Sequence, residues 1–316
     1  MDLFEQKNIH PMLIGADGEP FDSPDYIYEL KLDGERCVAY LDPKDGTELR
    51  NKRNVKMLPK FPELSDLHKQ VKKRCILDGE MIILKDGKPN FTEIQRRSLM
   101  SNQFKINLAA QQFPANFVAF DCLYIDGEDI VTRKLTDRKD TLHKAVKEGG
   151  RLALSRVVDG RGVDFYRLAE EHDLEGIVAK RKDSIYIQDK RTKDWIKIKN
   201  LKDDDFVVCG YIRKGNHMTS IILGQYLDGE LVYKGHVTLG VGGKSFARIA
   251  EQPTTDALPF RVPPGNENAI WVRPELVCTV KYMEKTASGG MRQPVFKGLR
   301  DDKNPEECLS SGQTTE

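Results

Sequence analysis

The sequence predicts an α+β domain over residues 1–201 and an all-β domain of OB type over residues 202–316. Three observations support this division. The 316 residues are about twice the length of a typical domain. Asp-Gly dipeptides between short apolar runs recur along the chain and are typical of antiparallel hairpins. Patterns of helical period occur mainly before Leu201 and become rare after it.

In the first domain, short runs rich in apolar and β-branched residues beside Asp-Gly dipeptides predict strands. Segments with apolar residues three or four positions apart predict helices between these strands. The expected strands are Tyr26–Lys31, Cys37–Leu41, Cys75–Leu77, Glu80–Leu84 and Phe117–Ile125, and the expected helices are Thr92–Ser101, Thr136–Lys147 and Val163–His172.

The second domain shows short alternating runs separated by glycine turns. The expected strands are Phe206–Arg213, Ser220–Tyr226, Glu230–Val237, Ala269–Val272 and Leu276–Met283, with one helix near Lys244–Glu251. Five strands and one short helix suit an OB-type barrel, which binds nucleic acid across its strands and loops. The acidic residues 203–205 are expected to form a hinge or linker between the domains.

Composition excludes several classes of protein. No run approaches the roughly 18 consecutive apolar residues of a membrane span, so we expect no membrane partner. The six cysteines form no C-x-x-C pair, which disfavours a structural zinc and favours a reduced, cytoplasmic compartment. The net charge of +1 means that any nucleic-acid site must be a local patch.

Two stretches qualify as such a patch. One holds Arg50, Lys52, Arg53, Lys56 and Lys60 without an acidic residue, and the other spans residues 182–202. Each could be a solvated charged face or a contact with a polyanion.

A chemically suggestive segment lies at residues 29–36. An apolar strand ends at Lys31, and Asp33-Gly34 then predicts a tight turn before Arg36. Burial against the strand favours the uncharged, nucleophilic form of the lysine amine. Asp33 could orient that amine or accept its proton, and Arg36 could hold a phosphate or ribose. The alternative is a solvated hairpin with ordinary surface charges.

Residues 31–36 resemble the nucleotidyltransferase motif of ATP-dependent DNA ligases and mRNA capping enzymes, and further motifs of this superfamily follow in order. They are Lys52-Arg53-Asn54, Leu77-Asp78-Gly79-Glu80, Phe120-Asp121-Cys122-Leu123-Tyr124, Glu175-Gly176-Ile177-Val178-Ala179-Lys180, Trp195-Ile196-Lys197-Ile198-Lys199 and Arg292–Lys303. The last is similar to the carboxy-terminal motif of bacterial ATP-dependent ligases. Residues 51–54 depart from the Ser-Arg-x-Gly element, although Arg53 is kept.

The resemblance implies an adenylation domain followed by an OB-fold domain, as in minimal bacterial or phage ligases and the ligase domain of bacterial end-joining proteins. It implies Lys31 as the nucleophile, with Asp33 and Lys199 also catalytic. ATP would contact Glu29, Lys31, Arg36, Arg53, Glu80, Phe120, Lys197, Lys199, Arg292, Arg300 and Lys303. Glu175 and Glu80 would bind Mg²⁺, for which Mn²⁺ could substitute.

The implied reaction is the sealing of 5′-phosphate/3′-hydroxyl nicks in duplex DNA by a monomer. Little sequence precedes Lys31, so we expect barrel loops or a recruiting protein to help bind DNA, in an intracellular enzyme of bacterial, phage or viral origin. The alternatives are an mRNA capping guanylyltransferase, an RNA ligase and a non-catalytic nucleic-acid-binding protein. The sequence has no counterpart of the four-cysteine zinc site of NAD-dependent ligases.

Overall fold

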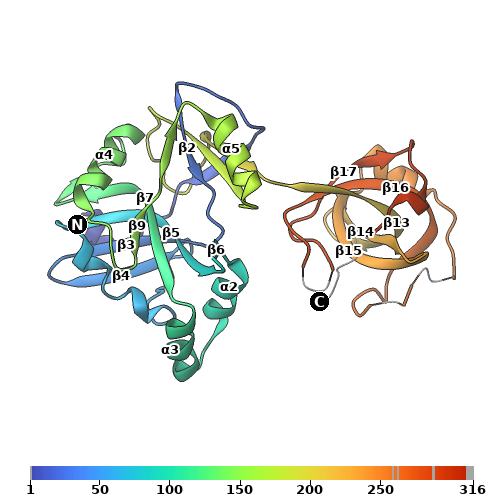
Figure 1. Ribbon diagram of the computed structural model, residues 1–316, viewed down its shortest axis with the longest axis horizontal. Coiled ribbons are helices and arrows are strands. Elements are labelled where there is room, and N and C mark those ends of the chain that lie inside the picture. The colour runs from blue at the N-terminus through green and yellow to red at the C-terminus, as the bar shows by residue number, and fades with distance from the viewer. Residues whose placement is uncertain (1, 258–259, 262, 287–288, 311–316) are drawn as a thin grey trace. The chain divides into compact units, whose positions relative to one another are not determined.

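The computed structural model describes residues 2–257, 260–261, 263–286 and 289–310. The chain divides into two compact units, Met1–Asn200 and Leu201–Glu316. The first unit mixes helices with mainly antiparallel sheets, and the second is built mostly from strands (Figure 1). The expected α+β class is therefore confirmed. None of the helices in the described ranges is long and apolar enough to cross a membrane.

The first unit is built on two sheets. One sheet has the order β1 (Leu13–Asp17), β12 (Arg191–Lys199), β11 (Gly176–Arg181), β2 (Tyr26–Leu30) and β10 (Val157–Asp159). The other has the order β4 (Gly46–Asn51), β3 (Glu35–Asp42), β5 (Cys75–Lys85), β7 (Ala115–Ile125) and β8 (Glu128–Asp129), with β6 (Lys88–Pro89) beside β5 and β9 (Leu152–Leu154) parallel to β7.

Five α-helices accompany these sheets in the described part of the unit. They are α1 (Leu3–Gln6), α2 (Phe91–Leu99), α3 (Gln103–Gln112), α4 (Leu135–Ala145) and α5 (Gly162–Glu171). Short 3₁₀ turns occur at Pro62–Leu64 and Leu67–Gln70. Helix α3 was not predicted, because its apolar residues do not form one buried face: Ile106 is buried, whereas Phe104 is 77% exposed.

The link between β2 and β3 carries the chain from one sheet to the other. Asp33-Gly34 was expected to close a hairpin, but β2 and β3 pair with different strands. A Cβ atom on Gly34 would lie 2.1 Å from the carbonyl oxygen of Met81, so the linking segment can approach β5 only because residue 34 is glycine. This segment also carries Lys31, which is thereby placed between the two sheets.

The Asp78-Gly79 dipeptide was also expected to form a turn, and this was wrong. Residues 75–85 form one strand, β5, whose register with β7 shifts at Asp78/Gly79. Asp78 is fully buried and bound by Arg36, which explains an acidic residue inside a strand. Asp-Gly is a turn signal only where the aspartate can reach solvent.

The second unit is a five-stranded antiparallel sheet with the order β15 (Glu230–Gly240), β14 (Met218–Leu227), β13 (Lys202–Lys214), β16 (Ile270–Tyr282) and β17 (Val295–Arg300). Its strands curl round one another as in a barrel (Figure 1). Helix α6 (Lys244–Ala250) buries Phe246 and Ile249 in the same core as Phe206 of β13. A short 3₁₀ turn at Pro305–Glu307 follows the last strand.

Two expectations for the second unit were wrong in detail. The runs Ala269–Val272 and Leu276–Met283 belong to one long strand, β16, and the fifth strand is the unpredicted β17. Residues 203–205 do not form a linker but lie within β13. Asp205 fits there because its carboxylate accepts hydrogen bonds from Thr279 and Lys303.

Candidate active site

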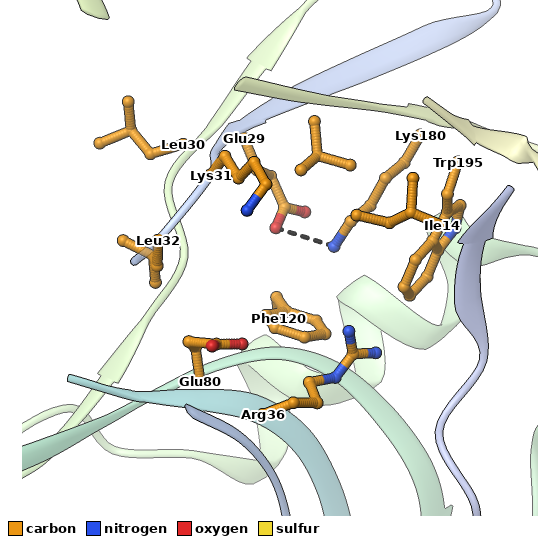
Figure 2. A pocket seen from close by; sticks show the side chains of 11 residues that line it. Ile14, Glu29, Leu30, Lys31, Leu32, Arg36, Glu80, Phe120, Lys180 and Trp195 are labelled. Atoms are coloured by element: carbon orange, nitrogen blue, oxygen red, sulfur yellow. Dashed lines mark hydrogen bonds and ion pairs between the residues drawn. The ribbon is translucent and has the colours of Figure 1, made fainter. Parts of the chain in front are cut away.

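A cavity of about 180 Å³ lies between the two sheets of the first unit. Its lining combines apolar side chains with several charged groups, drawn from strands of both sheets (Figure 2). The lining residues are Ile14, Glu29, Leu30, Lys31, Leu32, Arg36, Glu80, Phe120, Val178, Lys180 and Trp195.

Lys31 lies at this cavity with its amine bound to Glu175. The Nζ atom is 2.5 Å from Oε1 of Glu175, whose side chain is only 4% exposed. Burial raises the pKa of Glu175, the positive charge of Lys31 opposes this rise, and the nearby Asp33 adds to it. The next residue, Gly176, has a φ of +128°, and a Cβ atom there would lie 2.1 Å from the carbonyl oxygen of Ile198, so this position beside Glu175 requires glycine. The expected nucleophile and metal ligand are therefore in direct contact.

Glu80 lines the same cavity from the middle of β5. Burial raises the pKa of Glu80 to about 8, although the charges of Arg36 and Lys31 oppose the shift, and the carboxylates of Asp78 and Glu175 add to it. Arg36 is held by both oxygens of Asp78 at 2.5–2.6 Å. Among the described contacts, Asp78 is paired with Arg36 and Glu175 with Lys31, whereas none joins Glu80 directly to a cation.

This raised pKa predicts how stability changes with pH. Because the folded protein holds the Glu80 proton more tightly than the unfolded chain does, the stability contributed by the protonated carboxyl is lost as pH rises from 4.5 to about 8. We expect Glu80→Gln to melt at increasingly higher temperature than the wild type over this range, with a constant difference above it. Melting curves recorded in EDTA from pH 5 to 9 would test this. The exposed Glu171→Gln variant is the control, and a difference that does not vary with pH would contradict the assignment.

Phe120 and Glu29 also line the cavity. Phe120 is 8% exposed, and its ring lies between Lys180, with Nζ 4.1 Å from the ring centroid, and Arg36, with Cζ at 4.5 Å (Figure 2). Glu29 is paired with Lys180 at 3.1 Å and with Lys139. Burial lowers the pKa of Lys180 to about 8, although the charge of Glu29 opposes this shift.

Strand β12 carries the other two predicted lysines, two residues apart. Lys197 lies 3.3 Å from the exposed Asp17. Burial lowers the pKa of Lys199, and the positive charges of Lys197 and Lys31 lower it further. Lys199 and Lys31 are thus close enough to act on one another, which fits a site that receives an anion.

Arg53 lies outside this cavity. It lines a second cavity of about 390 Å³ that shares Arg36 and Glu80 with the first. In the basic stretch around it, Lys52 and Lys56 are also exposed, whereas Arg50 pairs with Glu48 and Lys60 binds the carbonyl of Met100.

The predicted residues of the second unit form local ion pairs. Arg300 binds both oxygens of Asp302 and lies 3.4 Å from Asp205, which Lys303 also binds at 2.8 Å. Arg292 lies 3.0 Å from Glu284. Asp205 therefore holds Arg300 and Lys303 beside one another.

The chain matches two family models. The ATP-dependent DNA ligase domain matches residues 16–199, and the ATP-dependent DNA ligase C-terminal region matches residues 214–303. The first match alone covers more than half of the chain. The chain belongs to the ATP-dependent DNA ligase family.

Individual relatives agree with this family assignment. DNA ligase C1 of Mycolicibacterium smegmatis is 31% identical over 98% of the chain and 94% of its own length. The multifunctional non-homologous end joining protein LigD of Mycobacterium bovis is 28% identical over 97% of the chain, which spans only 40% of that protein. The structure of a mycobacterial DNA ligase D complexed with ATP and MES aligns with a TM-score of 0.57 at 28% identity, over 98% of the chain and 99% of the other.

These ligase matches confirm the predicted recognition, the adenylation and OB folds and the enzyme class. They do not favour the capping enzyme, the RNA ligase or the non-catalytic binding protein.

The ligase site also contains residues that were not singled out from the sequence. Lys180 and Trp195 belong to two of the sequence motifs but had no predicted role, and both line the cavity. Asp78, which holds Arg36, was likewise quoted only as part of a motif. Nothing in the sequence indicated that Lys139 is buried near the site, because a lysine on a helix rich in charged residues is normally exposed.

Proposed function

We propose that this chain seals 5′-phosphate/3′-hydroxyl nicks in duplex DNA, with adenylation in residues 1–201 and the OB fold in residues 202–316. The observation that carries the proposal is the position of the Lys31 amine, which lines a partly apolar cavity and is paired with Glu175. A nucleotide base in that cavity would present its α-phosphate toward this amine.

In the first step, Nζ of Lys31 attacks the α-phosphorus of ATP. An N–P bond forms, the bond from the α-phosphorus to the bridging oxygen breaks, and pyrophosphate leaves. The amine must lose a proton before or during attack, and Glu175, its direct partner, or the nearby Asp33 can accept it. Lys197 and Lys199 would stabilise the charge that develops on the phosphate.

The base and ribose have candidate contacts in the same cavity. Phe120 offers a ring face for stacking on adenine, and this requires that Lys180 or Arg36 withdraw from one of its faces. The carboxylate of Glu29 can accept a hydrogen bond from the amino group of adenine. Arg36, which Asp78 holds, is a candidate for a contact with the ribose or a phosphate.

Mg²⁺ fits the pair of Glu175 and Glu80. Both carboxyl groups have raised pKa values, chiefly through burial. The charge of Glu175 further raises the pKa of Glu80, and the charge of Asp33 further raises the pKa of Glu175. A divalent cation, Mg²⁺ or Mn²⁺, would relieve this repulsion, with phosphate oxygens completing its ligands. When bound, the metal would neutralise charge on the transferred phosphate.

The later steps use DNA. A 5′-phosphate oxygen attacks the AMP phosphorus and breaks the N–P bond of Lys31, and the 3′-hydroxyl then attacks the DNA 5′-phosphorus and releases AMP. Arg53 and the exposed Lys52 and Lys56 are candidates for contacts with DNA phosphates, so affinity should fall with salt. We propose that the enzyme acts as a monomer, which a partner protein could recruit to DNA.

Covalent labelling tests the proposal. The protein is incubated with Mg²⁺ and α-labelled ATP, GTP or NAD and run on a denaturing gel, before and after stripping of bound AMP with pyrophosphate. Label from ATP alone, followed by sealing of a nicked duplex, would support a DNA ligase. Label from GTP alone, or no label after stripping, would overturn the proposal.

The motif at the end of the second unit should act mainly in the first step. Arg292, Arg300 and Lys303 are candidates for contacts with the β- and γ-phosphates, which leave before DNA is joined. We expect Arg300→Ala or Lys303→Ala to slow self-adenylation by about a hundredfold. Sealing of a pre-adenylated nick should be affected far less, and Arg248→Ala, which removes a separate ion pair with Asp301, is the control. Equal losses in both reactions would contradict this role.

A further inference from the structure

Lys139 is a buried lysine for which the proposed reaction has no use. It lies on helix α4, is 6% exposed and pairs with one oxygen of Glu29, while Lys180 pairs with the other at 3.1 Å. Glu29 and Lys180 line the nucleotide cavity, whereas Lys139 reaches Glu29 from outside the lining. The arrangement is a single buried carboxylate held by a lysine on each side.

Stability alone does not account for the second lysine. Lys180 by itself would neutralise Glu29, and a further buried cation adds a desolvation cost. The adjacent Arg138 anchors α4 through a fully buried, two-bond contact with Asp121. Helix α4 is therefore held in place by Arg138, and Lys139 is free to serve the contact with Glu29 rather than to anchor the helix.

The two lysines determine both the charge and the direction of the carboxylate. Burial raises the pKa of Glu29, but the charges of Lys139 and Lys180 outweigh this and lower it below the ordinary value. With one lysine on each oxygen, the carboxylate cannot rotate without breaking a pair. Glu29 thus presents fixed oxygens that can only accept hydrogen bonds.

We propose that Lys139 is a positioning residue for nucleobase selection, because it keeps Glu29 an acceptor-only group toward the base. This rests on the proposed lysyl-AMP reaction. Adenine carries an amino donor at its six position, which matches a carboxylate. Hypoxanthine and guanine carry a carbonyl oxygen there, which a carboxylate repels. Without Lys139, Glu29 can rotate or hold a proton, and a protonated carboxyl can donate to that carbonyl.

The test measures base selection rather than activity alone. Self-nucleotidylation efficiency is measured with α-labelled ATP and ITP for the full chain and for Lys139→Met. We expect the ITP-to-ATP ratio of efficiencies to rise about tenfold in Lys139→Met, as for loss of one hydrogen bond to a charged group. Lys139→Arg, which keeps the charge, should restore the wild-type ratio.

A combined variant separates this role from a general effect on the fold. In a Glu29→Gln background, Lys139→Met should not change the ratio further, because the group through which it acts is gone. Equal loss of labelling with both nucleotides and an unchanged ratio would overturn the proposal. Lys139→Gln gives the same test if Lys139→Met does not fold in a melting assay. Absence of any label from ATP in the wild type would instead refute the proposed function.

Discussion

Lys31→Ala should abolish formation of the covalent AMP adduct, with a loss of at least about a thousandfold in labelling rate. Two described lysines line the cavity, and of these Lys31 has its Nζ atom 2.5 Å from Glu175, whereas Lys180 is paired with Glu29. The fold should persist, because Lys31 follows the end of β2 and its backbone N–H bond to Gly176 is unaffected by the side chain. Labelling with α-labelled ATP on a denaturing gel measures the loss.

Two further variants sharpen this result. Lys31→Arg keeps a positive charge beside Glu175 but offers no usable nucleophile, so it should be as inactive as alanine in labelling. The exposed Lys85→Ala variant should label like the wild type. Both Lys31 variants should still seal a pre-adenylated nick, since that reaction bypasses the lysyl adduct. Persistent labelling of Lys31→Ala would place the nucleophile elsewhere.

Hairpin turns could be predicted from the sequence where they reach solvent. Asp45-Gly46, Asp86-Gly87, Asp126-Gly127 and Asp228-Gly229 all join paired strands, as the hairpin signal indicates, although β4, β6 and β8 after the first three were not themselves predicted. Asp78-Gly79 is the same dipeptide, but its aspartate is buried and hydrogen-bonded to Arg36, a residue 42 positions away. Local patterns cannot show a partner at that separation, so the long strand β5 was divided in two.

The same limit applies to the site. The strand end at Lys31 and the alternation of Lys197 and Lys199 are local features, and the motif match placed them in one reaction. The ion pairs that set the charges of the site join distant segments: Lys31 with Glu175, and Glu29 with Lys139. A lysine such as Lys139 becomes distinctive only when folding removes it from water.

Arg138→Leu should destabilise the first unit by about 3–5 kcal/mol. Arg138 and Asp121 are both fully buried and joined by two hydrogen bonds of 2.8 and 2.9 Å. Arg138 also donates to the carbonyls of Arg133 and Ser184, so it ties α4 to two neighbouring segments. Leucine would leave the Asp121 carboxylate in the core without its cation, and burying an unpaired charge is the costly part of the change.

Urea unfolding in a Trp271→Phe background measures this, because Trp195 is then the sole tryptophan and reports on the first unit. The matched control is Arg181→Leu, which removes a similar pair with Asp183 that is about half exposed and should cost less than about 1 kcal/mol. Adding Asp121→Leu to Arg138→Leu should recover part of the loss, since no buried charge then remains. If Arg138→Leu costs no more than Arg181→Leu, the Asp121 contact does not anchor α4, and α4 is then not held in place independently of Lys139.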